Sequence, residues 1–125
     1  MKMFIYILLL FPINLYATTY LCIGEAGAGV ENTGAGGFKS QVYSVSNQKF
    51  ALSNDSGSWL LKKIGQDHPV FDQCDSEYMC RSKEGFSGIF LRDDDGIFTY
   101  AINQAYGAGL KKEIMLTVKG LCSRL

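Results

Sequence analysis

The chain has few of the residues on which catalysis and nucleic-acid binding most often depend. Its 125 residues include a single histidine, His68, and 12 basic residues against 12 acidic ones. That balance leaves no basic excess to bind nucleic acid or an anionic membrane by charge. No serine lies in a G-x-S-x-G motif, so a hydrolase would need His68 as the base of another arrangement. We expect no catalytic residue and no nucleic-acid partner, and keep a small hydrolase that uses His68 as an alternative function.

The motifs for metals and nucleotides are incomplete. The cysteines lack the closely spaced pairs that build a zinc site. The segment DDDG at residues 93–96 resembles part of a calcium loop, but Leu91 and Ile102 stand where ligands belong. The glycines that begin at Gly27 open like G-x-G-x-x-G, but Asn32 takes the third glycine position. The sequence therefore predicts no metal and no cofactor.

A sustained apolar run occurs near the N-terminus, where Phe4–Phe11 follows Lys2 and precedes the small residue Ala17. These are the parts of a secretory signal peptide. The run is shorter than the roughly 20 residues that a membrane-spanning helix needs. We predict a signal peptide at residues 1–17 and a single exported domain at residues 18–125, periplasmic or secreted and free of the membrane after cleavage. An uncleaved N-terminal anchor is the alternative.

The four cysteines, Cys22, Cys74, Cys80 and Cys122, all follow the expected cleavage site. An even number of cysteines in a small exported domain is typical of disulfides. Four cysteines allow three pairings, and the sequence does not decide among them. We favour Cys22–Cys122, which would join the ends of the domain, and Cys74–Cys80, which would close a short loop.

The strongest structural pattern is a β-hairpin between Gly85 and Ile102. Apolar and aromatic residues flank the Asp95-Gly96 pair, which is a frequent turn between paired strands. Both strands carry apolar residues on both faces, which predicts a strand pair covered on both sides or a barrel wall with one side partly shielded.

Short strand patterns with turn residues between them recur along the chain, and no sustained helical period appears after the signal. Eight or nine strands predict an all-β fold, either a small antiparallel β-barrel or a sandwich. We expect Gly24–Gly37 to be a mobile glycine-rich loop, Gly65–Cys80 to be irregular and Gln104–Gly109 to be a loop.

The segment Tyr20–Ala26 (YLCIGEA) resembles the opening of a group of small exported proteins of proteobacteria and their phages. The likeness continues through Lys49-Phe50, Gly57-Ser58-Trp59 and Lys62–Gly65 to Gly120–Ser123 (GLCS). It implies export in a Gram-negative cell and carries no established activity.

A second resemblance is to the periplasmic C-type lysozyme inhibitors, small disulfide-bonded β-barrels whose inhibitory loop reads S-G-S-x-Y. Ser56-Gly57-Ser58 matches the first half of that motif, and Leu60 stands where its tyrosine belongs. The likeness implies inhibition of a cell-wall enzyme such as lysozyme as an alternative function.

The predicted function is that of an exported binding module, monomeric, with an unknown protein or glycan partner. The possible binding residues are Ser56, Gly57, Ser58 and Trp59. Trp59 also suits a core position, because aromatic residues serve both binding surfaces and cores.

Overall fold

The computed structural model describes residues 17–32, 36–82, 88–103 and 114–125, so residues 1–16 of the predicted signal peptide and the Gln104–Gly109 loop lie outside it. The described residues form ten β-strands. They include no helix that is long and apolar enough to span a membrane. The strands are β1 (Thr19–Asn32), β2 (Phe38–Tyr43), β3 (Lys49–Ser53), β4 (Leu60–Lys63), β5 (Pro69–Phe71), β6 (Gln73–Ser76), β7 (Met79–Arg81), β8 (Gly88–Arg92), β9 (Ile97–Asn103) and β10 (Ile114–Arg124).

Nine of these strands form a nearly closed antiparallel barrel in the order β5-β4-β3-β1-β10-β9-β8-β7-β6. The two strands at the ends of that order, β5 and β6, are separated in sequence by Asp72 alone, and β4 contacts β6. The all-β prediction is confirmed, and of its two architectures the structure is the barrel.

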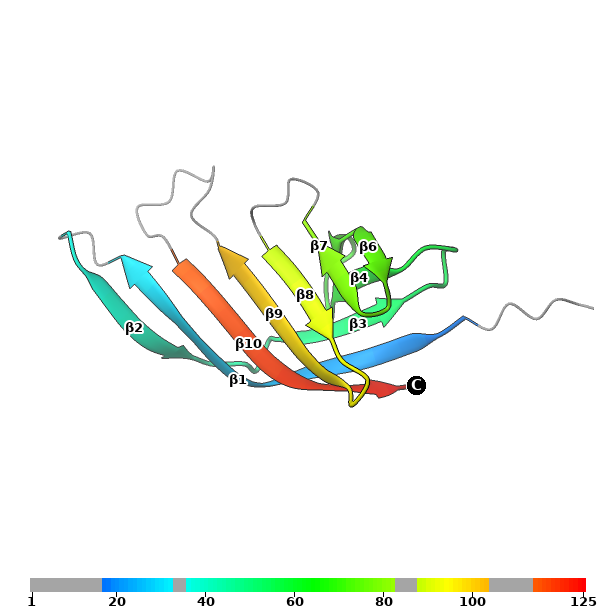
Figure 1. Ribbon diagram of the computed structural model, residues 1–125, viewed down its shortest axis with the longest axis horizontal. Helices are drawn as coiled ribbons and strands as arrows, with labels where there is room; N and C mark the ends of the chain where they lie inside the picture. Colours follow the sequence, from blue (N-terminus) through cyan, green and yellow to red (C-terminus); the bar gives the residue numbers. More distant parts are fainter. Residues whose placement is uncertain (1–16, 33–35, 83–87, 104–113) are drawn as a thin grey trace, which may run out of the picture.

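The tenth strand, β2, lies outside the barrel order and pairs with β1. The first part of β1 pairs with β3 and its later part, Gly27–Asn32, pairs with β2, while β10 follows the opposite edge of β1. The sheet therefore continues beyond the barrel as a wing, made of β2, Ala28–Asn32 of β1, Ile114–Thr117 of β10 and Ala101–Asn103 of β9. Figure 1 shows the wing extending to the left, away from β3–β7.

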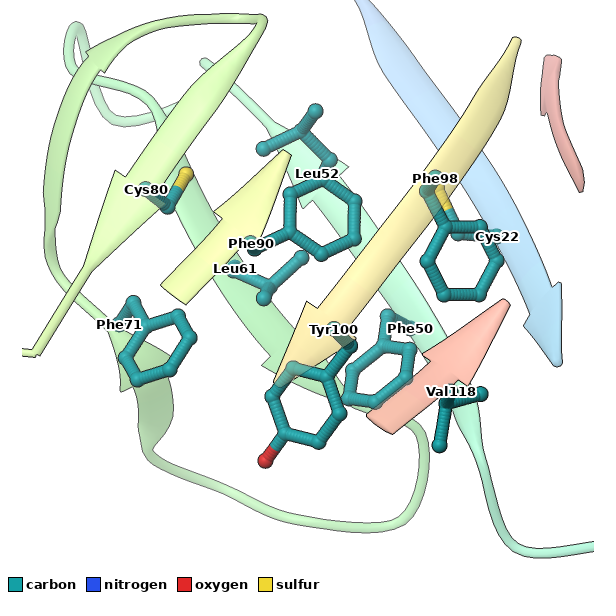
Figure 2. Packing of buried hydrophobic residues seen from close by; sticks show 10 residues of the cluster. All are labelled: Cys22, Phe50, Leu52, Leu61, Phe71, Cys80, Phe90, Phe98, Tyr100 and Val118. Atoms are coloured by element: carbon teal, nitrogen blue, oxygen red, sulfur yellow. The ribbon is translucent and has the colours of Figure 1, made fainter. Parts of the chain in front are cut away.

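The core fills the barrel at the other end of the sheet and is rich in aromatic rings (Figure 2). Phe50 lies at its centre, with its ring centroid 4.6 Å from that of Tyr100, 6.0 Å from Phe98 and 6.3 Å from Phe90. Such pairs each add about 0.5–1.5 kcal/mol beyond the burial of their area. The buried set is Cys22, Phe50, Leu52, Leu61, Phe71, Cys80, Phe90, Phe98, Tyr100 and Val118.

Both predicted disulfides are present, Cys22–Cys122 between β1 and β10 and Cys74–Cys80 between β6 and β7. In each bond the two cysteines lie directly opposite each other on neighbouring strands. The predicted hairpin is confirmed as β8 and β9. Its turn has Gly96 at φ 83°, and Asp93 Oδ1 accepts hydrogen bonds from the amides of Asp95 and Ile97 at 3.0 and 2.9 Å.

The prediction that Gly24–Gly37 is a mobile loop is wrong for the residues up to Asn32, which belong to β1. The three glycines of β1, Gly24, Gly27 and Gly29, face inward, where there is little room for a side chain. A Cβ at Gly24 would lie 2.8 Å from Val118 Cγ1, and one at Gly27 would lie 3.0 Å from Val45 Cγ1. Glycine in a strand is typical of such close approach, so the composition reflects packing and not mobility.

The prediction that Gly65–Cys80 is irregular is also wrong, because the segment contains β5, β6 and the start of β7. These strands have three or four residues each. So short a strand shows almost no alternation of apolar and polar residues, which is the pattern that identifies strands in a sequence.

Candidate interaction surface

The side chains of β2, β1, β10, β9 and β8 that point away from the core form one continuous sheet surface, which we call the outer face. The pairing registers place its members side by side across the strands. Ile23 lies opposite Leu121, which lies opposite Ile97, and Val30 lies opposite Met115 on one side and Ser40 on the other.

Large hydrophobic residues gather on this face. Of the eleven that are exposed in the described residues, eight belong to it. They are Ile23, Val30, Phe38, Val42, Leu91, Ile97, Met115 and Leu121. Scattered exposed hydrophobic residues are normal on a soluble protein, but a contiguous group of them marks an interaction site.

The outer face has two apolar regions with a polar strip between them. Ile23, Leu121 and Ile97 form the region on the barrel, and Val30, Met115 and β2 form the region on the wing. Between them Lys119 Nζ donates a hydrogen bond to Thr99 Oγ1 at 2.6 Å. Two charged side chains lie in this polar strip: Lys119, and the exposed Glu25 at the bulge of β1 beside it, and both line the same groove. The two apolar regions themselves carry no charged side chain among their named members, which is typical of interface cores.

Small side chains hollow the outer face into shallow grooves. One groove of about 460 Å³ runs over Ala26 and Ala28, between Val42 on β2 and Thr117 on β10. A second, of about 320 Å³, crosses Ala101 between Ile89 and Met115. Ridges of larger side chains beside such grooves are the shape against which another apolar surface packs.

The predicted binding residues lie elsewhere. Ser56, Gly57 and Ser58 are exposed in the turn between β3 and β4, where Gly57 has φ 91° and its amide donates to the Asn54 carbonyl at 3.0 Å. Trp59 is half-buried against the core, with its ring 6.1 Å from that of Tyr20. The structure therefore brings the three turn residues together at the surface and turns Trp59 inward.

Ser56 borders a further groove of about 230 Å³ on the wall of the barrel. It is lined by hydroxyl and charged side chains as well as apolar ones: Thr19, Ala51, Ser53, Asp55, Ser56, Leu60 and Lys62. Within this groove the Thr19 hydroxyl donates to Ser53 Oγ at 3.3 Å. The groove has donors and acceptors that a small polar ligand requires, but no aromatic platform among its lining residues.

His68 is exposed in the segment before β5. Among the described residues, no serine hydroxyl or carboxylate makes a hydrogen bond to its imidazole, so the structure assembles no nucleophile–base pair around it. Nor do the described parts of the chain contain three cysteine, histidine, aspartate or glutamate side chains grouped to hold a metal ion.

A buried polar cluster closes one end of the barrel. The guanidinium of Arg92 forms an ion pair with Glu77, at 3.5 Å from Nη2 to Oε2, and Tyr20 Oη donates to the same carboxylate oxygen at 2.9 Å. Hydrogen bonds to Asp94 and then to Glu77 raise the pKa of Tyr78 to about 12. Arg92 Nη2 makes the ion pair without a hydrogen bond, whereas Tyr20, Tyr78 and Glu77 are hydrogen-bonded within the cluster. The cluster is therefore a structural element and not an open site.

The outer face was not identified from the sequence. The signal for it was the presence of apolar residues on both faces of the two hairpin strands. That pattern predicted that other parts of the protein cover both faces of these strands or partly shield one of them. The described chain leaves Leu91 and Ile97 each 41% exposed, so it does not supply that cover.

Comparison with known proteins found no match among family models, curated proteins or solved structures. The case for a function therefore depends on the geometry of the outer face.

Proposed function

We propose that the protein is an exported binding module that docks a protein partner onto the outer face. The observation that carries the proposal is the collection of eight exposed large hydrophobic residues on one face of the sheet. Removing such a surface from water is favourable by roughly 25 cal/mol per Å² of apolar area, and this gain offsets the freedom that the two proteins lose on association. A glycan partner suits this face less well, because sugars require hydrogen-bonding groups that its apolar regions lack.

Two features support export. The N-terminal segment has the composition of a signal peptide, and both disulfides suit an oxidising compartment. A domain of this size gains much of its stability from such bonds, which favours function outside the cytoplasm.

A photo-crosslinking amino acid at Met115 or Leu121 tests the proposal. Each position is exposed on the outer face and lies on β10, which β1 separates from β2. A control probe at Lys62, exposed on β4, reports contacts with the rest of the surface. We expect the two face positions to give an adduct with the same protein and the control to give none.

The captured protein is then purified and its affinity measured with Met115→Asp, Leu121→Asp and Lys62→Glu variants. A charge buried in an apolar contact should weaken binding at least tenfold, whereas the Lys62 variant should bind as the parent protein does. Equal affinity for all variants, or no adduct from either face position, would refute the proposal.

The turn at Ser56–Ser58 favours a second candidate, inhibition of a cell-wall enzyme such as lysozyme. The turn is exposed and is held by hydrogen bonds, including one from Ser56 Oγ to the Ser58 carbonyl at 3.3 Å. A rigid projecting loop can enter an active-site cleft with little entropy loss. The test is a lysozyme inhibition assay in which Ser56→Ala and Ser58→Ala should raise the inhibition constant; absence of inhibition by the parent protein eliminates this candidate.

A further inference from the structure

The strand β2 forms an edge of the sheet. It pairs with β1 on one side, and in the described part of the chain nothing pairs with its other side. An edge strand presents a row of free backbone N–H and C=O groups to which another strand can add. Many edges are protected by charged side chains, but Lys39, the one charged residue of β2, lies on the inner side opposite Glu31 of β1.

The outer side of β2 carries the two most exposed hydrophobic residues of any strand described. Phe38 is 79% exposed and Val42 is 84% exposed, and both lie on the same face with Ser40 between them. Neither packs against the rest of the chain well enough to remove it from water.

We propose that a second copy of this chain pairs with β2 in the antiparallel direction, with Ser40 opposite Ser40 at the two-fold axis. A symmetric pair must keep the same side chains on the same face, which restricts the possible registers. In this register Phe38 of each copy lies opposite Val42 of the other. Both exposed residues thereby gain an apolar neighbour. Because the pair is symmetric, the Phe38–Val42 contact occurs twice in the dimer.

The side chains on the inner side of β2 provide an independent reason for this register. Gln41 Oε1 is buried and has no hydrogen-bond partner. A buried acceptor without a donor is costly, because the water that solvated it in the unfolded chain is not replaced. In the proposed register Lys39 of the second copy lies opposite Gln41, and its ammonium group donates to that oxygen once the Gln41 side chain turns out of its buried position towards the pairing edge.

The size of the contact sets its strength. Six residues of β2 from each copy, with two phenylalanine and two valine side chains, bury less than the roughly 1,600 Å² of a standard stable interface. The dimer is therefore weak and depends on concentration. It replaces the monomer expected from the sequence, and it joins the outer faces of two copies into one wider sheet. It does not depend on the proposed function.

Sedimentation equilibrium over a wide range of protein concentration tests the dimer, with both disulfides intact. We expect the apparent mass to rise from one copy towards two. The double variant Phe38→Lys, Val42→Lys should raise the dissociation constant by roughly tenfold or more, because it places like charges along the pairing edge. The matched control is Val30→Lys, which changes an outer-face residue of β1 away from the edge and should leave the constant unchanged.

The register is tested by a Ser40→Cys variant under mild oxidation. Directly opposed residues of antiparallel strands have Cα atoms about 4.5–5.5 Å apart, a separation that a disulfide spans. We expect an intermolecular bond between the two introduced thiols, mapped by peptide mass, and no dimer from Lys62→Cys. A protein monomeric at all concentrations, a dimer weakened by Val30→Lys but not by the edge variant, or equal crosslinking at both positions would each overturn the proposal.

Discussion

The guanidinium carbon of Arg92 lies 4.0 Å from the centroid of the Tyr20 ring and 4.8 Å from that of Tyr78, so the charge is held between two aromatic faces. The side chain is nearly inaccessible, and its Nε donates to the Glu77 carbonyl at 3.2 Å. These contacts join β1, β8 and the turn between β6 and β7, which are far apart in the sequence. Arg92 therefore fixes the turn over the end of the barrel.

Arg92→Ala should lower the free energy of unfolding by about 2–5 kcal/mol, because it removes a buried side chain and leaves a space between the rings, while the partly exposed Glu77 loses its ion-pair partner. The matched control is Arg81→Ala. Arg81 pairs with Asp75 at 3.6 Å, but about half of each side chain is exposed, so its loss should cost less than about 1 kcal/mol. Urea unfolding of the oxidised protein measures both. Equal effects of the two substitutions would show that the buried cluster adds nothing to stability.

The two disulfides should differ in their contribution to stability. Cys22–Cys122 closes a sequence separation of 100 residues and Cys74–Cys80 one of 6. In the chain-entropy model the first is worth about 4–5 kcal/mol and the second about 2 kcal/mol. Replacing each pair with alanine and comparing urea midpoints and slopes checks the order. A larger loss from the short loop would contradict it.

The parts of the fold that were predicted correctly are those for which neighbouring residues in the sequence form a distinctive pattern. The hairpin of β8 and β9 has a glycine that adopts positive φ between two apolar runs, and the cysteines have spacings that suit one long and one short loop. The glycines of β1 misled the prediction, because their role depends on Val45 and Val118, residues that are distant in sequence. A local pattern contains no information about such packing.

The outer face was beyond prediction for a related reason. Val30, Met115 and Val42 are unremarkable in their own segments and become one surface through the pairing of β1 with β10 and β2. The sequence predicted apolar residues on both sides of the strands, but the extension of the sheet beyond the barrel follows from the unequal lengths of the strands. The predicted residues Ser56–Ser58, by contrast, are exposed because polar turn residues favour the surface wherever the strands lie.

Glycine at position 120 should be required by its neighbours. A Cβ there would lie 2.7 Å from Phe98 Cε1 and would overlap the carbonyl oxygen of Ile23 on β1. Gly120→Ala should therefore cost about 1–3 kcal/mol, the usual range for overpacking. Ala28→Val, on the exposed outer face, is the control and should change stability by less than about 0.5 kcal/mol. If thermal and urea unfolding show no difference between the two variants, the close approach of β1 and β10 at Gly120 is not required.

Alkaline pH should destabilise the barrel through Tyr100. Burial raises the pKa of this phenol to about 12, compared with about 10 in an unfolded chain. Below pH 10 the tyrosine is neutral in both states and its contribution is fully present. Between pH 10 and 12 the unfolded chain loses the proton while the native protein keeps it, so the free energy of unfolding falls as pH rises.

Tyr100→Phe isolates this effect, because it keeps the ring in the core and removes the ionisable group. The variant should lose less stability than the parent protein between pH 10 and 12, by up to about 2 kcal/mol. Tyr78→Phe should also flatten the alkaline profile, since hydrogen bonds to Asp94 and Glu77 raise the pKa of Tyr78 to about 12. Urea unfolding at a series of pH values from 8 to about 11.5 provides the comparison. Parallel profiles for the parent protein and Tyr100→Phe would show that Tyr100 keeps an ordinary pKa and that the core around it admits water.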